Sequence, residues 1–350
     1  MKAIELFPYW ADNRALLSEA IKSLTAQDLE FGPAVGLKPL GELLRHVITT
    51  EEYWWHGGIL GEPSETWRPF EWDTFTDAQK AAHRAGRFPT VASIVEGLEA
   101  AHEPVAEFLE TADAAVLCEK RRSAWGQDNT LRWMVWHLVE HDQHHRAQAY
   151  TRLRLLGHEA PPSFPRQLVM GFTPAGAWRP GEDEVRNIVP FWNSVRSTLR
   201  EAVAGLTQED LAFNPAGEGL AQGLASIHDI ILHIFIWEDF LIPQRLQNDV
   251  NGWGKSEGWF WKSAVDSLAE NVGEHFPSVA ALLNGLDSVG EATNAFIGRL
   301  ALSDLTRTYQ TPWGPQTLHH RLWYAREHMV HHRAQLFLRM RMIGRTPPEI

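Results

Sequence analysis

The chain has 350 residues, enough for about two domains, and its 44% hydrophobic and 22% charged content is ordinary for a protein with a buried core. Lys and Arg number 32 against 44 Asp and Glu, and the formal net charge of -12 argues against nucleic acid or an anionic membrane as the main partner. A single cysteine, Cys118, excludes an intrachain disulfide framework and a Cys-rich zinc module, and we expect it to be an ordinary small apolar residue.

The apolar runs are too short to cross a bilayer, and the charged start of the chain, Met1 to Glu5, does not resemble a signal peptide. We therefore expect a cytoplasmic protein. The first predicted elements are helices over Leu6–Leu24 and about Leu40–Gly57, where apolar residues recur at helical spacing.

A third helix is expected to begin after Thr90, a natural N-cap that follows Phe88-Pro89. A fourth is predicted over Thr130–Leu156 and should stop at Gly157, because glycine suits the left-handed position that ends a helix.

The second half repeats these elements. Its four helices are predicted over Val185–Leu206, over about Ile227–Leu246 after a Ser226/Asp229 capping box, after the N-cap Ser278, and over Thr317–Ile343 before Gly344. Strand-like alternation is scarce. The chain is therefore predicted to be all-α, with an antiparallel four-helix bundle in each half.

Self-comparison indicates a tandem duplication. The segments 140–157 and 327–344 share ten identical positions at a spacing of 187: Glu140, His141, His144, His145, Arg146, Ala147, Gln148, Arg152, Arg154 and Gly157. Other matches lie at 182 and 188, which places a short insertion in the second copy around Gly217–Gly223. The Pro- and Gly-rich stretch between the copies predicts domains 1–162 and 183–350 with a linker over 163–182.

The repeat separates the histidines into two classes. Seven of those without a histidine at the matching place are interpreted as surface or partly buried imidazoles: His56, His83, His102, His137, His158, His275 and His319. Those with a match form four pairs: His46 with His233, His141 with His328, His144 with His331, and His145 with His332.

The spacing of the matched histidines suggests a metal site. His141 and His145 stand at i and i+4, so their rings project from one helix face and can reach one ion. His46 supplies a third candidate ligand from the second helix, and His233, His328 and His332 repeat the arrangement. His144 and His331 are rotated by about 100° and are interpreted as supporting or structural residues.

The alternative is a set of core histidines that recur only because the domain was duplicated. A third histidine at the same separation of 95 residues in both copies favours metal. Three neutral imidazoles suit Zn²⁺, Ni²⁺, Mn²⁺ or Fe²⁺, with up to two ions per chain, and leave a coordination position open, as in catalytic sites. Acidic residues follow the second-helix histidines by five positions, as Glu51 and Glu238.

Two further features leave alternatives open. Arg146 and Gln148, like Arg333 and Gln335, either tie their helix to its neighbour or anchor a polar or anionic substrate group. The tryptophans near the second helix either wall an apolar pocket or, as we favour, pack in the core or between domains: Trp54, Trp55, Trp237, Trp253, Trp259 and Trp261.

The second-helix histidine and the His-x-x-His-His-Arg-Ala-Gln run that closes in Arg-x-x-Gly resemble the DinB/YfiT-like superfamily, which includes low-molecular-weight-thiol S-transferases. The resemblance covers about 1–162 and 183–350, with Ala147 and Ala334 where the family usually has Gly. It implies a four-helix bundle with a three-His divalent site, with His46, His141 and His145 as ligands in the first copy and His233, His328 and His332 in the second.

We therefore expect a divalent-metal-dependent transferase or hydrolase acting on a low-molecular-weight thiol or another small polar substrate, with no catalytic residue assigned beyond the ligands. The open position would activate a thiol or water. The alternative is a non-catalytic metal-binding module in which the two domains pack as an intramolecular pseudo-dimer. Because His137 is matched by Tyr324, we expect the two sites to differ in affinity, with the first half binding more strongly.

Overall fold

The structure is a computed structural model that describes residues 2–7, 10–67, 74–124, 126–160, 183–215, 226–239, 276–311 and 314–349. It divides into two compact units, Met1–Pro165 and Arg166–Ile350. The predicted linker over 163–182 and the expected insertion near Gly217–Gly223 lie outside the described residues, as do Trp253, Trp259, Trp261 and His275. No helix in the described part of the chain is long and apolar enough to span a membrane.

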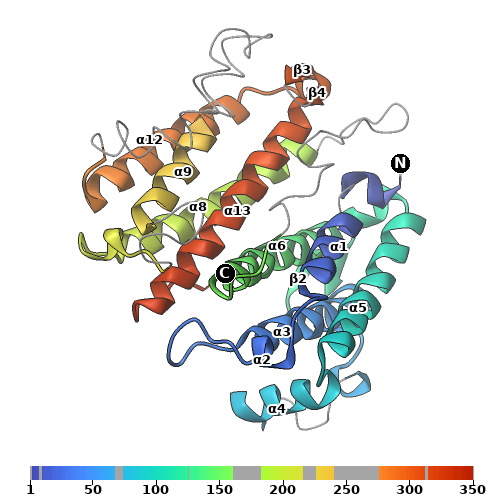
Figure 1. Cartoon of the computed structure of the whole chain (residues 1–350). Helices are drawn as coiled ribbons and strands as arrows, with labels where there is room; N and C mark the ends of the chain where they lie inside the picture. The colour runs from blue at the N-terminus through green and yellow to red at the C-terminus, as the bar shows by residue number, and fades with distance from the viewer. Residues whose placement is uncertain are drawn as a thin grey trace. The chain divides into compact units, whose positions relative to one another are not determined.

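The first unit is a four-helix bundle. Helices α1 (Trp10–Ile21) and α3 (Leu40–Tyr53) each pack against both α5 (Val91–Thr111) and α6 (Leu131–Leu155), as Figure 1 shows in blue to green. The smaller elements are η1 (Ala3–Leu6), α2 (Ala26–Leu29), the π-helix η2 (Trp54–Leu60), η3 (Ser64–Thr66), α4 (Asp77–Arg87), η5 (Ala114–Cys118), β1 (Lys120–Arg122) and β2 (Asp128–Thr130).

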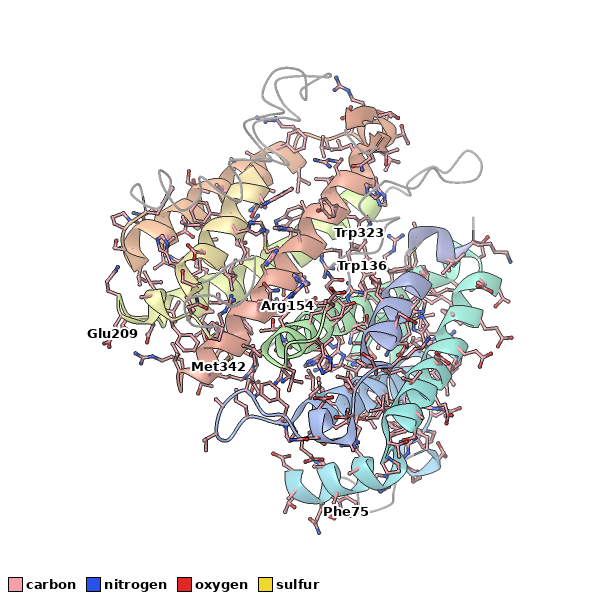
Figure 2. All side chains as sticks on the ribbon, in the orientation of Figure 1. Phe75, Trp136, Arg154, Glu209, Trp323 and Met342 are labelled. Carbon is pink, nitrogen blue, oxygen red and sulfur yellow. The ribbon has the colours of Figure 1, made fainter. Side chains whose placement is uncertain are left out.

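The second unit repeats this packing. Helices α8 (Asp183–Ala204) and α9 (Ile227–Asp239) each pack against α12 (Val279–Ile297) and α13 (Leu318–Met342). The short elements are η6 (Asp210–Ala212), η10 (Leu302–Thr306), β3 (Thr308–Thr311) and β4 (Gly314–Thr317). The predicted all-α architecture with two tandem bundles is confirmed. Figure 2 labels one buried pair of matching residues, Trp136 on α6 and Trp323 on α13.

The predicted helix boundaries rest on cap residues that the structure confirms. Thr90 accepts a hydrogen bond from the backbone N–H of Ser93, and Ser278 accepts one from Ala281. Ser226 and Asp229 form the reciprocal pair of a capping box. Gly157 and Gly344 have φ of 84° and 76°, the left-handed conformation that ends α6 and α13.

Several elements differ from the sequence-based expectation. Helix α1 ends at Ile21 rather than Leu24, and the helix predicted over about Leu40–Gly57 consists of α3, which ends at Tyr53, and the π-helix η2, which ends at Leu60. Helix α4 and the hairpins β1–β2 and β3–β4 were not predicted, and these hairpins lead directly into α6 and α13. Their strands of three or four residues are too short to show alternation. Cys118 is exposed and lies at the C-terminal end of the short helix η5.

The repeated Phe-Pro sequence is explained by a close packing contact. Phe88 lies against Gly97 of α5, where an added Cβ would come within 2.5 Å of its ring. Phe276 lies in the same way against Gly285 of α12, where the corresponding separation is 2.9 Å. Glycine is thus needed at these two helical positions because the aromatic ring occupies the space of a side chain.

Candidate metal centres

In the first unit, three histidines from two packed helices converge. His46 comes from α3, whereas His141 and His145 come from one face of α6. The Nε2 atoms of His46 and His141 are 3.2 Å apart, and one ring nitrogen from each of the three residues lies within 4.8 Å of the others. The structure therefore brings together the three residues that the sequence predicted as ligands.

Two of the three rings have a hydrogen-bond partner at Nδ1. Thr50 Oγ1 lies 3.3 Å from His46 Nδ1, and Gln148 Oε1 lies 3.2 Å from His145 Nδ1. If each Nδ1 carries the proton and donates it, each Nε2 keeps its lone pair. His144 lies outside the group, and its Nε2 is 2.8 Å from the amide nitrogen of the same Gln148.

The electrostatics favour the neutral form of His46 and His141. Burial, aided by the charges of Lys38 and Arg84, lowers the pKa of His46 to about 4. Burial and the neighbouring histidines lower the pKa of His141 well below its ordinary value. Neutral imidazoles are the form that binds metal ions, so proton competition at pH 7 is small.

The separation of the rings also fits a shared ion. Zn–N bonds of about 2.0–2.1 Å in a tetrahedral site place neighbouring nitrogens about 3.3 Å apart. The 3.2 Å between His46 and His141 is close to that value. Two unprotonated nitrogens facing each other at this distance would otherwise repel, and an ion between them removes the repulsion.

The second unit holds an equivalent group of His233 on α9 with His328 and His332 on α13. The Nε2 atoms of His233 and His328 are 2.9 Å apart, and burial lowers the pKa of both residues well below the ordinary value. Gln335 Oε1 lies 2.9 Å from His332 Nδ1, and its amide nitrogen lies 3.1 Å from His331. Gln335 thus repeats the role of Gln148.

The two groups differ in their surroundings. The place of Thr50 is taken by Trp237 in the second unit, and His233 Nδ1 is buried without a hydrogen-bond partner among the described residues. The Trp237 ring centroid lies 5.1 Å from that of His328. Tyr324 lies 6.3 Å from His328, where the first unit has His137 at 6.5 Å from His141.

In each unit, a buried arginine–glutamate ion pair joins the first helix of the bundle to the helix that carries the first histidine of the group. Arg14 on α1 binds Glu51 on α3, and it also lies 3.2 Å from Asp142, the neighbour of His141. Burial alone would raise the pKa of Glu51, but Arg14 and His102 outweigh this effect and lower it. Arg14 thereby links α1, α3 and α6.

The second unit repeats part of this support, with Arg196 on α8 bound to Glu238. Sequence reasoning noticed the two carboxylates but missed both arginines. Their spacing of 182 equals that of the Leu-Thr matches near the start of each half, so the repeat contained the signal.

The recurring Arg and Gln have structural contacts. Arg146 is completely buried and donates to Asn13 Oδ1 on α1 at 2.7 Å, and Arg333 donates to Thr198 Oγ1 on α8 at 2.9 Å. Each arginine therefore ties the fourth helix of its bundle to the first. Gln148 and Gln335 hold histidines, as described above. These contacts favour the first of the two alternatives for this motif.

A cavity of about 740 Å³ lies beside the first site. His46, Thr49 and Thr50 line it from α3, Trp54 and Trp67 from the following segment, and α4 from the other side. Trp54 therefore walls a pocket, the alternative that we had favoured less. Trp55 packs against Phe108 and Trp237 against the second histidine group. His46 belongs to both the histidine group and the cavity wall. A small molecule in the cavity would therefore lie next to the histidine group.

Comparison with protein families matches residues 1–169 to the DinB family and residues 192–336 to the DinB superfamily. Neither the curated proteins nor the solved structures contain a match to the chain. The two matched ranges contain all six histidines of the two groups.

Proposed function

The chain belongs to the DinB superfamily, with one member domain in each half, and from this premise we propose that the first unit is a divalent-metal-dependent enzyme. Its reaction is a transfer or hydrolysis on a low-molecular-weight thiol or another small polar molecule. The observation that carries the proposal is the convergence of His46, His141 and His145 in one group, of which His46 also lines a substrate-sized cavity.

His46, His141 and His145 would hold the ion, and three protein ligands leave a position for substrate. A divalent ion there supplies Lewis-acid activation of a thiol or a water molecule at neutral pH. Thr50 and Gln148 orient the rings of His46 and His145, and burial lowers the pKa of His141, which favours its neutral form. Trp54 and Trp67 give the cavity an aromatic wall.

The test is activity of the full chain loaded with Zn²⁺, Ni²⁺, Mn²⁺ or Fe²⁺. Each form is incubated with a small thiol and an electrophile such as monobromobimane, and thiol consumption is compared with that of the metal-free chain. Metal-dependent consumption that is lost in His46→Ala supports the enzyme. Tight metal binding without turnover for any thiol or electrophile supports the alternative, a non-catalytic metal-binding module.

The second unit favours that alternative for its own site. Trp237 and Tyr324 pack near His328, which is only 4% exposed, and His332 is 8% exposed. A site covered by aromatic rings suits an ion that stabilises the bundle. We therefore propose that turnover depends on the first unit, so that His233→Ala leaves thiol consumption unchanged whereas His46→Ala abolishes it.

A further inference from the structure

Arg14 is buried between the two helices that carry the first histidine group, although its own helix α1 contributes no ligand. Its side chain is 5% exposed, and one guanidinium nitrogen, Nη2, both donates to Glu51 on α3 and lies 3.2 Å from Asp142 on α6. Helix α3 carries His46, and α6 carries the other two histidines. A single cation therefore joins both ligand-bearing helices.

The last helix of the bundle also takes part. The other carboxylate oxygen of Glu51 lies 3.0 Å from Nδ1 of His102 on α5, and the His102 ring stacks on Trp10 of α1 with centroids 4.8 Å apart. We call Arg14, Glu51, His102 and Asp142 the polar cluster. It takes one residue from each of the four helices, and all of its polar contacts lie inside the bundle.

The second unit forms the same bundle without most of this cluster. Met329 stands at the place of Asp142 and is buried, so no carboxylate on α13 faces the arginine. Gly290 stands at the place of His102, and a Cβ added there would come within 2.6 Å of the Arg196 side chain. The arginine of the second unit thus occupies the space that a side chain would need at this position of α12.

The contacts of Arg196 are accordingly narrower than those of Arg14. Among the described residues, Arg196 has polar contacts with Asn193 on its own helix and with Glu238 on α9, and none with α13. Buried ion pairs are often no more stabilising than well-packed apolar residues of similar volume. The polar cluster of the first unit therefore calls for an explanation other than the stability of the fold.

The two units differ in what surrounds the histidine groups. In the second unit, the Trp237 ring lies 5.7 Å from that of His233 and 5.1 Å from that of His328, so aromatic packing supports the ligands. In the first unit, Thr50 takes the place of Trp237, and α3 lines the cavity. Atoms at a cavity wall lack packing partners on that side. The position of α3 relative to α6 then depends more strongly on contacts within the bundle.

We propose that Arg14 is a positioning residue of the first metal centre, which fixes the spacing of α3 and α6 by binding Glu51 and Asp142. The spacing matters because metal–ligand distances vary by only about 0.2 Å, and His46 and His141 stand on different helices. This inference deepens the proposed function and depends on it for the presence of an ion at the histidines, but not for any reaction.

The duplicated chain allows the same change to be made twice. Arg14→Met/Glu51→Gln removes the ion pair of the first unit, and Arg196→Met/Glu238→Gln removes the matching pair of the second. Each double variant loses one positive and one negative charge, so the net charge near the ion stays the same. Urea denaturation establishes that each variant is folded.

The measurement is a titration of Co²⁺ into the metal-free full chain, followed by the d–d absorption of the bound ion. Each site is observed alone, the first in a His233→Ala background and the second in a His46→Ala background. We expect the first site to bind Co²⁺ about tenfold more weakly in its double variant, the lower end of what changes to outer residues cause. Its molar absorption should also fall, because tetrahedral Co²⁺ absorbs more strongly than Co²⁺ of higher coordination number.

The second site should keep its affinity and its spectrum in the matched variant, because Arg196 has no polar contact with α13 among the described residues. The spectrum separates positioning from stability. A bundle that is merely less stable would take up less ion, but each bound ion would absorb as before.

Asp142→Asn provides a second and milder test. It removes the charge that pairs with Arg14 on α6, with almost no change of shape, and it leaves the pair with Glu51 in place. We expect a smaller loss of affinity and a fall in molar absorption in the same direction. The inference is overturned if both first-unit variants keep the affinity and spectrum of the unmodified site, or if the matched variant weakens the second site to the same extent.

These outcomes also separate the inference from the proposed function. A first site that binds Co²⁺ and does not respond to either variant contradicts the role of Arg14 and leaves the proposed function intact. An unmodified chain that takes up no Co²⁺ at His46, His141 and His145 contradicts the proposed function, and the role of Arg14 with it.

Discussion

His141 and His145 project from one face of α6, and His144 is turned about 100° away, with its ring near the Gln148 amide. We therefore predict that His141→Ala or His145→Ala lowers metal affinity of the first unit by well over 100-fold, more than changes to outer residues cause. His144→Ala should largely keep the ion. The measurement is metal titration in a His233→Ala background, which silences the second unit. Loss of the ion in His144→Ala but not in His141→Ala would refute the assigned ligands.

Thr50 allows a finer test. Its hydroxyl lies next to His46 Nδ1 in the first unit, whereas the matching residue in the second unit is Trp237. Thr50→Val should weaken metal binding of the first unit about 10- to 100-fold, since the ring loses the group that orients it. Thr49→Val is the matched control, because Thr49 lines the same cavity but bonds to the backbone carbonyls of Arg45 and His46. Equal affinities of the two variants would contradict this role of Thr50.

The grouping of the six histidines could be predicted from two features of the sequence. The i, i+4 spacing places two of them on one helix face, and the same pattern recurs 187 residues later in the chain. Arg14 and Arg196 were missed because a lone arginine on an amphipathic helix looks like a solvent-exposed residue. Only the tertiary packing of α1 on α6, and of α8 on α13, brings these side chains into the interior.

At the scale of single elements, the contact between Phe88 and Gly97 sets two effects against each other. Alanine is favoured over glycine within a helix by about 0.5–1 kcal/mol, but a methyl group at Gly97 would meet the Phe88 ring and Ile48. Overpacking costs about 1–3 kcal/mol. We therefore predict that Gly97→Ala lowers the free energy of unfolding by about 1–2 kcal/mol, measured by urea denaturation.

Gly86 of α4 is the control, because nothing lies within 4 Å of a Cβ added there. Gly86→Ala should be neutral or stabilise the protein by up to about 1 kcal/mol. Equal effects of the two substitutions would contradict the packing explanation.

The elements themselves were predictable to different degrees. The four long helices of each bundle have apolar periodicity and cap residues, so their existence followed from the sequence. Helix α4 was missed because its periodic stripe is Lys80, His83, Arg84 and Arg87, and a search for apolar residues does not detect a basic one.

At the scale of the whole molecule, the metal-free protein should lose stability as the pH falls below about 6.5. The pKa of His46 is about 4 in the folded protein, whereas the unfolded chain binds protons near 6.5. The contribution of this residue is therefore complete above pH 6.5 and is lost as the pH falls toward 4. From His46 alone we expect a loss of about 1–2 kcal/mol between pH 7.5 and 5.

Denaturation of the metal-free chain at several pH values measures this effect, and the fall should be less steep in His46→Gln. His141, His233 and His328 add to it in the same direction. The lowered pKa of Glu51 acts only at more acidic pH, near the ordinary carboxylate range. A free energy of unfolding that stays constant from pH 7.5 to 5 would contradict the buried neutral state of these histidines.

The relation between the two units also has a measurable consequence. The first site has Thr50 and a neighbouring cavity, whereas His233 lacks a described partner at Nδ1 and lies among aromatic rings. We therefore retain the expectation that the first unit binds its ion more strongly. The pairing of His137 with Tyr324 already predicted that the two sites differ, and the contacts of each ring add Thr50 in the first unit and Trp237 in the second.

The most direct measurement is a calorimetric titration of Zn²⁺ or Co²⁺ into the metal-free full chain, with elemental analysis of the saturated protein. The account predicts two ions per chain in two resolved steps, with the tighter step lost in His46→Ala and the weaker step lost in His233→Ala. One ion or none per chain at saturation would contradict the claim that each half holds a three-histidine metal site, and so would two ions that both histidine variants still bind.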